Sequence, residues 1–436
     1  MTARKFFLSF LSISIISCAV SVSISQGFLV LSFLVLIFSP KEKWEINRIF
    51  LISLLFWLGE FFIFIIHFSF SNFDLSYLKI ALNAELKDFF LYLAFICMMN
   101  LKKSELPQMR QSIHAFAFML IITGFISIFS EFRLGWLIAS ISRTMTSWAY
   151  QHNYFRLGIF SINLPIGLMN THLTYGGLLM FVYPWIFFQG FQDLFSKKRL
   201  ITKLLSISLL MIASIVFVLN NARSAMGGAL VSIALGFLIW YFRGMKFPIS
   251  KRILFSALVI LVLFVSLLSL PSEPARRILT PLLGADKHTD SGRSFIWNST
   301  WSLIQKQPIL GIGPGNYSKE IEVARKKLSL KYDELAFFYE TTQRGHAHND
   351  YLHLWVTFGF LILFLYLILA YFLVQALLVS QLPFIELALY LGLGGFFAAG
   401  LLQCYFQDDE VVIFFWMLFG MFTRSNQLNQ SNEDIA

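Results

Sequence analysis

The sequence predicts an all-α protein that crosses a membrane many times. The chain is 57% hydrophobic and only 13% charged, with a mean hydropathy of +0.69, whereas soluble globular domains carry about 25% charged residues. Its apolar residues form continuous runs close to the length of about 20 residues that an α-helix needs to cross a bilayer. The runs lack the period-two alternation of a membrane β-barrel. We therefore predict a polytopic helical bundle.

The apolar runs predict about twelve spans, with boundaries good to a few residues. The predicted helices are 6–24, 27–40, 47–70, 86–101, 113–130, 164–190, 203–221, 224–242, 253–270, 352–379, 384–405 and 410–423. The second is short for a complete span, so we expect it either to tilt or to form a tight hairpin with the first.

Basic residues in alternate short loops predict the orientation. They gather at Arg4 and Lys5, at Lys41, Lys43 and Arg48, at Lys102, Lys103 and Arg110, at residues 197–203, and at residues 243–252. The positive-inside rule places these loops and both termini in the cytoplasm. The net charge of +10 is then a topology signal, and we predict no nucleic-acid partner.

Cys18, Cys97 and Cys404 lie in or beside apolar runs, which argues against disulfides and cysteine metal sites.

This topology divides the chain into residues 1–270 with nine spans, a large periplasmic loop over 271–351, three spans over 352–423, and a disordered cytoplasmic tail over 424–436. The loop is too long to be a plain connector. Amphipathic spacing in 294–306 and 317–335 predicts helices along the membrane surface, joined by a Gly-rich turn at 311–316. The turn lacks the Lys-Ser/Thr pair of a P-loop, which argues against nucleotide binding.

Two arginines on the predicted periplasmic side are candidates for phosphate binding. Arg223 begins a span, where a charge is costly unless it is paired or hydrated. Arg293 follows a glycine in a polar turn. A planar guanidinium stays charged and grips phosphate oxygens with two bonds. The alternatives are snorkelling or a salt bridge for Arg223 and an exposed loop position for Arg293.

Three histidines and an aspartate lie within eight residues at the end of the large loop. His348 is a candidate general base, because the unperturbed pKa of histidine lies near neutral pH. One alternative is a hydrogen-bonded or solvent-facing loop histidine. Another is a metal site built from His346, His348, Asp350 and His353. The spacing does not match a zinc helix motif, so we predict no metal site.

Other ionisable residues mark the same side of the bundle. Asp408 and Asp409 lie between the last two spans and suggest a carboxylate pair of the kind used in glycoside hydrolysis. Adjacent side chains point apart, so we expect only one to face a site. His172 lies in the periplasmic half of the sixth predicted span and is a candidate for contact with a substrate head group. Glu60 lies inside the third span, where either a functional role or a helix-bonding role is open.

Four segments, taken in order, resemble the O-antigen ligase and O-antigen polymerase superfamily. They are Arg223–Ala229, Ser291–Trp297, Pro308–Tyr317, and His348–Leu352 with Gly359. Members of this superfamily are bacterial inner-membrane enzymes that move glycans from undecaprenyl pyrophosphate. The order and spacing match over residues 220–359, while the first 200 residues match only in hydropathy.

The resemblance implies a role for each matching residue. Arg223 and Arg293 would bind the pyrophosphate, His348 would be the catalytic base, and Asp408 or Asp409 would be the acidic residue before the last helix. Thr357 stands where the family often has glutamate. The implied donor is an undecaprenyl pyrophosphate-linked glycan and the implied acceptor is lipid A–core, in a membrane-lipid setting without metal or cofactor. Transfer would invert the anomeric centre.

Within the superfamily, the length, the span count and the single large late loop favour a ligase over a repeat-unit polymerase. A protein O-oligosaccharyltransferase often carries a large extra C-terminal domain, which does not follow the last span here. A glycosyltransferase C-like architecture is compatible with the pattern. A transporter or flippase is the alternative from another class. Against it, we find no inverted repeat, and the charged residues gather on one side of the membrane.

Overall fold

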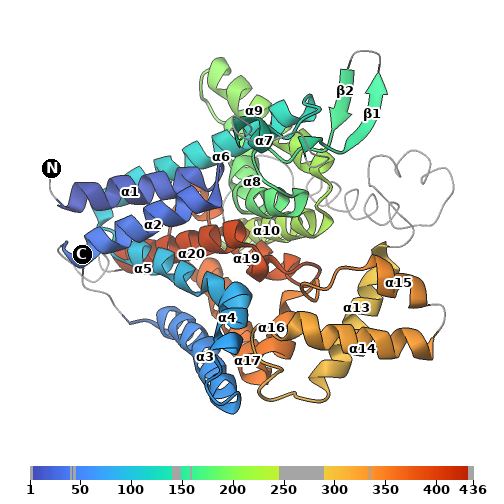
Figure 1. Ribbon diagram of the computed structural model, residues 1–436. Coiled ribbons are helices and arrows are strands. Elements are labelled where there is room, and N and C mark those ends of the chain that lie inside the picture. The colour runs from blue at the N-terminus through green and yellow to red at the C-terminus, as the bar shows by residue number, and fades with distance from the viewer. Residues whose placement is uncertain are drawn as a thin grey trace.

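The computed structural model describes residues 3–39, 42, 46–139, 149–157, 160–244, 289–332 and 335–430. These residues are mostly helical, with one two-stranded hairpin (Figure 1). The predicted span 253–270 and the first part of the predicted loop, up to residue 288, lie outside the described residues.

The N-terminal half, up to residue 195, has α1 (Ala3–Ser17), α2 (Val22–Ile37), α3 (Arg48–Phe70), α4 (Leu75–Asn83), the 3₁₀ helix η1 (Glu85–Tyr92), α5 (Leu93–Met99), η2 (Lys103–Glu105), α6 (Leu106–Ile128), α7 (Leu134–Ala139), β1 (Asn153–Leu157), β2 (Phe160–Asn163) and α8 (His172–Phe195). The rest has α9 (Leu200–Asn220), α10 (Arg223–Phe242), α13 (Thr289–Ile304), α14 (Tyr317–Lys331), α15 (Ala336–Thr341), α16 (Asp350–Phe358), α17 (Phe360–Val379), α18 (Phe384–Ala388), α19 (Leu391–Ala399), η6 (Tyr405–Gln407) and α20 (Asp409–Gln430).

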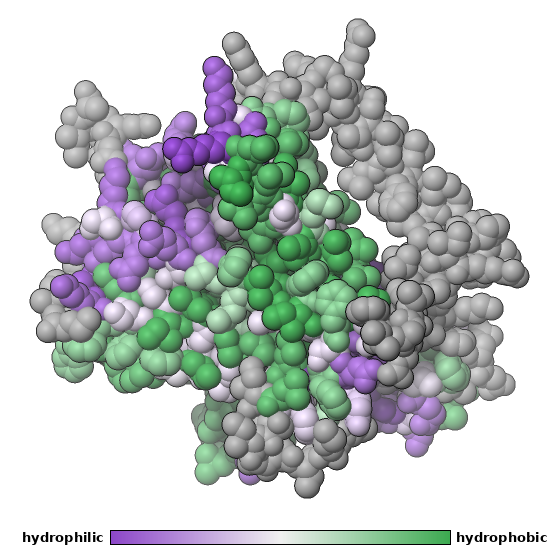
Figure 2. All heavy atoms as spheres, turned by 90° about the horizontal axis from the view of Figure 1, so that it is seen from above, coloured by the Kyte–Doolittle hydropathy of each residue, from purple (hydrophilic) through white to green (hydrophobic). Residues whose placement is uncertain are grey.

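Five helices of the described chain are long and apolar enough to cross a membrane. They are α3, η2 together with α6, α9, α10 and α17. In Figure 2, apolar side chains cover the middle of the face that is seen, and polar side chains gather at its left and at its lower right edge. The chain is therefore an α-helical membrane protein, but the predicted count of twelve spans is not confirmed.

Several predicted spans are shorter or broken in the structure. The run 86–101 divides into η1 and the short α5, and 384–405 divides into α18 and α19. The predicted span at 164–190 begins only at His172, after the antiparallel β1–β2 hairpin that the prediction missed. The short second helix does pack against the first, as one of the two expected arrangements. Apolar composition identified where these segments are buried, but not where the backbone breaks.

The last helix is longer than predicted and lies at the centre of the bundle. The side chains of Val411–Met421 are all buried, and α20 packs against α5, α8 and α19. The tail was expected to be disordered after Arg424, yet α20 continues to Gln430. Arg424 is itself buried, and its Nε donates to the carbonyl of Leu101 at 2.8 Å. This tertiary bond holds the polar final turns of the helix in place.

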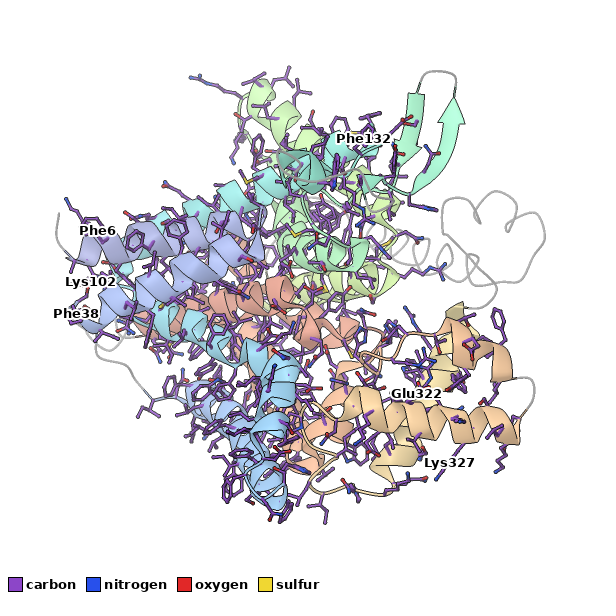
Figure 3. All side chains as sticks on the ribbon, in the orientation of Figure 1. Phe6, Phe38, Lys102, Phe132, Glu322 and Lys327 are labelled. Atoms are coloured by element: carbon purple, nitrogen blue, oxygen red, sulfur yellow. The ribbon has the colours of Figure 1, made fainter. Side chains whose placement is uncertain are left out.

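Helices α13, α14 and α15 project from the end of the bundle opposite the start of α1 (Figure 1). The amphipathic segments in the loop were therefore correctly predicted to be helical. Glu322 and Lys327 on α14 lie at this end, far from Phe38 and Lys102 (Figure 3). In Figure 1, α14 points outward from the bundle, an orientation that amphipathic spacing alone did not indicate.

The predicted span 352–379 is interrupted, and the Gly-rich turn forms hydrogen bonds at the interruption. At Gly359 the backbone adopts φ +84°, which ends α16 and begins α17. The break leaves helix carbonyls without intrahelical partners. The N–H of Ile312 bonds the carbonyl of Val356 at 2.8 Å, and the N–H of Gly313 bonds that of Thr357 at 3.0 Å. The glycine motif is thus a docking surface for α16 in this structure.

Candidate functional site

Residues 403–409, which connect α19 to α20, bond to four separate parts of the fold. We call them the 403–409 segment. Gln403 contacts His348, the Cys404 thiol accepts from the N–H of Asn349, Tyr405 contacts Ser224 of α10, Asp408 accepts from Thr174 of α8, and Asp409 pairs with Lys87 of η1. Elements far apart in sequence therefore meet at this segment.

His348 occupies a strained turn immediately before α16. Its backbone has φ +50°, in the left-handed region that non-glycine residues seldom adopt. Asn349 then caps the helix, with its side chain accepting from the N–H of Leu352 at 2.9 Å. The His348 N–H donates to Nδ1 of His346 at 3.2 Å, and its own Nδ1 lies 2.8 Å from the Oε1 of Gln403. Such strain at a polar turn is frequent at functional sites.

Burial lowers the pKa of His348, the hydrogen bond with Gln403 raises it, and the positive charge of Arg293 lowers it further. The net direction is downward from the usual 6.5. His348 is therefore neutral at pH 7 and has a lone pair available to accept a proton.

Arg325, on α14, anchors the chain that leads to His348. Its guanidinium is fully buried and donates to the carbonyls of Gln343 and Thr342, at 2.9 Å each, at the end of α15. The same group lies over the ring of Phe295 on α13, 5.4 Å from the ring centroid. The Nε1 of Trp297 donates to the carbonyl of Ala347 at 3.0 Å. Helices α13 and α14 together hold the histidine turn.

Arg293 lies inside α13 and not in the turn that the sequence suggested. It is partly buried, and its charge acts on both His348 and Tyr405. Gly292, just before it, brings α13 close to α15, because a Cβ there would lie 3.0 Å from the side chain of Thr342. Arg293 and His348 are thus neighbours in space.

Arg223 is the first residue of α10, as predicted. The preceding helix ends at Asn221 in the left-handed conformation, with φ +58°, which reverses the chain sharply. The Arg223 side chain is exposed, and the hydroxyl of the next residue, Ser224, lies 3.0 Å from that of Tyr405. Tyr405 therefore contacts the first turn of α10, and the charge of Arg293 also acts on it.

The structure separates the two adjacent aspartates. The Oδ2 of Asp408 accepts a bond of 2.6 Å from the hydroxyl of Thr174, while Asp409 pairs with Lys87 at 2.7 Å. Burial raises the pKa of Asp408 well above its usual value, and the nearby Glu410 raises it further. The side chains point apart, as expected from their adjacency, so they form no carboxylate dyad.

His172 is the first residue of α8, two positions before the Thr174 that bonds Asp408. Its described electrostatic neighbour is His152. The structure thus places His172 on the helix that meets Asp408, but shows no contact between it and Arg223, Arg293 or His348.

The other residues of the histidine run have separate surroundings. His346 meets His348 edge to face at 4.5 Å between ring centroids, and burial, with His348 and His353, lowers the pKa of His346 to about 3. His353 is buried against Tyr317 and lies 3.4 Å from Glu85. Asp350 accepts from the N–H of Phe406. Among the described residues, no group of three or more His, Cys, Asp or Glu is arranged to hold a metal ion.

Glu60 belongs to another buried group. With Glu85 and Asp88 it lines a cavity of about 30 Å³, beside Gln407 of η6. Such a volume holds about one water molecule and no sugar. Glu60 therefore contributes to a buried polar cluster between α3, η1 and α16.

Sequence reasoning missed Gln403, Tyr405, Thr174 and Arg325. The first three are neutral, and their partners lie 55, 181 and 234 residues away. Arg325 lies in a basic helix whose spacing gives no sign that one arginine is buried. One sequence signal could have located the start of α16, because Asn349 is a favoured N-cap residue directly before an apolar run.

Comparison with known proteins places part of this region in a family. Residues 208–367 match the family model described as O-antigen ligase (Wzy_C). The match includes Arg223, Arg293 and His348, but not His172 or Asp408. A search of curated protein sequences finds no match.

One similar solved structure comes from work described as "Structural coordination of polymerization and crosslinking by a peptidoglycan synthase complex". The two chains are 15% identical, and the alignment covers 88% of this chain and 98% of that chain with a TM-score of 0.38. That score is too low to indicate a common fold. The evidence for kinship is therefore the family match, in which residues 208–367 are similar to the O-antigen ligase family.

Proposed function

We propose that the protein is an O-antigen ligase, which transfers a glycan from undecaprenyl pyrophosphate to a sugar of lipid A–core. The family supports glycosyl transfer from a lipid-linked donor in general. The observation that carries the proposal is the meeting of His348, Arg293 and the start of α10 at the 403–409 segment. We place this site on the periplasmic side of the inner membrane, with both termini in the cytoplasm.

The residues suit direct displacement at the anomeric carbon. The acceptor hydroxyl gives its proton to His348 as its oxygen bonds to the anomeric carbon. The bond from that carbon to the pyrophosphate oxygen breaks, and its electron pair leaves with the pyrophosphate. Arg223 and Arg293 stabilise the negative charge that develops there. One displacement without an enzyme nucleophile inverts the anomeric centre, and the two fixed cations supply the charge that the leaving group needs.

Asp408 has a supporting place in this scheme. Its bond to Thr174 ties the 403–409 segment to α8, and His172 begins the same helix. We propose that Asp408 orients the segment and that His172 contacts the lipid-linked substrate. Neither residue lies in the segment that matches the family, so these two roles rest on the structure and the resemblance alone.

The first test is the glycan profile of the host after deletion of the gene. A ligase leaves long glycans on undecaprenyl pyrophosphate and bare lipid A–core. Single repeat units on lipid A–core would instead identify a polymerase, and loss of a glycoprotein would identify a protein O-oligosaccharyltransferase. An unchanged profile would contradict glycan transfer and favour a transporter.

Complementation then tests the site. We expect His348→Ala and Arg223→Ala to restore no transfer, while His114→Ala does restore it, because His114 is an exposed residue of α6 stacked on Trp185. EDTA is expected to leave transfer by the purified protein unchanged. Full activity of His348→Ala would show that His348 is not the general base. Loss of transfer activity with EDTA would instead favour a metal site.

A further inference from the structure

The side chain of Gln403 touches the histidine that we propose as base. Gln403 is 5% exposed, and its Oε1 lies 2.8 Å from Nδ1 of His348. An amide oxygen only accepts hydrogen bonds, so this contact requires a proton on Nδ1. A neutral imidazole carries one proton, and its lone pair is therefore on Nε2.

We propose that Gln403 is a positioning residue, which holds His348 in the Nδ1–H tautomer and makes Nε2 the atom that accepts the proton of the acceptor hydroxyl. This inference rests on the proposed function. The backbone assists, because the left-handed turn at His348 directs its N–H to His346 while the ring is held by Gln403. Main chain and side chain are thus fixed by different partners.

The neutrality of Gln403 is part of its role. Charged and titratable groups surround His348 on each packed element: Arg293 on α13, His346 in the same turn, Asp350 at the start of α16, and the Cys404 thiol beside Gln403. A carboxylate at position 403 would stabilise the imidazolium and raise the pKa of His348. The neutral amide of Gln403 also raises the pKa, but burial and Arg293 lower it and the net direction stays downward, so the base is unprotonated at neutral pH.

The test compares two substitutions in the full-length protein, with a polyprenyl pyrophosphate-linked glycan as donor. In Gln403→Glu, the acid limb of the kcat/KM profile should move up by about one unit or more. Activity should then fall most at pH 6 to 7 and recover at higher pH. In Gln403→Met, which keeps length and burial, kcat should fall about tenfold or more while the KM for donor stays unchanged.

Gln305→Glu is the matched control, because it adds the same charge at an exposed position after α13. Its pH profile should equal that of the unmodified protein. An unmoved acid limb in a folded Gln403→Glu protein would overturn the inference and leave Gln403 as a packing residue.

If Gln403→Glu does not fold, Gln403→Met carries the test alone, and an unchanged kcat would overturn the inference. Failure of the proposed function is distinguishable. In that case His348→Ala would also remain active, whereas failure of this inference alone leaves His348→Ala inactive.

Discussion

His348 combines a strained backbone, a neutral hydrogen-bonding partner and a nearby arginine. These features predict a pH dependence. A general base acts when unprotonated, so activity is present above its pKa and is lost as the pH falls through it. Because burial and Arg293 lower the pKa of His348, the acid limb of kcat/KM should have its midpoint below the usual histidine value of 6.5.

Arg293→Gln should move that acid limb toward higher pH, because it removes one of the two influences that lower the pKa. The position of the limb is the readout, since we also expect the variant to lose affinity for the proposed donor. A limb at or above pH 6.5 in the unmodified protein would contradict this account of His348.

The buried Arg325 gives a second prediction, which concerns stability. Its guanidinium donates to carbonyls at the end of α15, and Arg325→Met removes this donor from the partly buried Thr342 and Gln343. Hydrogen bonds to charged groups contribute roughly 1.5–3 kcal/mol each. We expect a lower melting temperature and strongly reduced transfer, with partial rescue by Arg325→Lys. Lys326→Met, at the exposed next position, should change neither.

The chemistry of the site was predictable from residue type, but its supports were not. Arginine and histidine stand out in an apolar sequence, because placing a charged or basic side chain beside a membrane span is costly unless the side chain has a partner or a function. Gln403 and Tyr405 carry no such signal, and their roles depend on contacts with His348 and Ser224 that only the folded chain creates.

Among the elements, the break between α16 and α17 makes the sharpest prediction. A Cβ on Gly359 would clash with the carbonyl oxygen of Ile309, in a backbone conformation that only glycine adopts readily. Gly359→Ala should therefore destabilise the protein by at least about 2 kcal/mol. Thermal melting in detergent measures the effect.

Gly227→Ala is the control, because Gly227 lies in the second turn of α10 and a Cβ there would meet nothing within 4 Å. It should be neutral or stabilise by up to about 1 kcal/mol. Equal melting temperatures for the two variants would contradict the docking of the Gly-rich turn on α16.

Element existence was largely predictable, and element boundaries were not. Apolar runs located α3, α6, α9, α10 and α17, because burial in lipid or protein selects the same residues. The break at Gly359 lies inside an uninterrupted apolar run, and it is compensated by bonds from residues 312 and 313. Hydrogen bonds from a distant loop do not change the hydropathy of the helix, so the hydropathy pattern could not predict this break.

At the scale of the whole molecule, the prediction concerns sidedness. Lys102 and Lys327 lie at opposite ends (Figure 3), and both side chains are exposed. In cells with a permeabilised outer membrane, a membrane-impermeant maleimide should label Lys327→Cys and not Lys102→Cys. The native cysteines are buried, so background labelling should be low. Labelling of Lys102→Cys alone would reverse the proposed topology.

The 403–409 segment also has a consequence for how the protein is made. Synthesis proceeds from the N-terminus, so Arg223, Arg293 and His348 leave the ribosome before Gln403 and Tyr405. The contacts that join these groups span 55 and 181 residues and form only when the last helices have been inserted. A nascent chain would then carry these side chains without the 403–409 segment that contacts them. If the proposed function is right, the protein should become active only after its final helix has been inserted into the membrane.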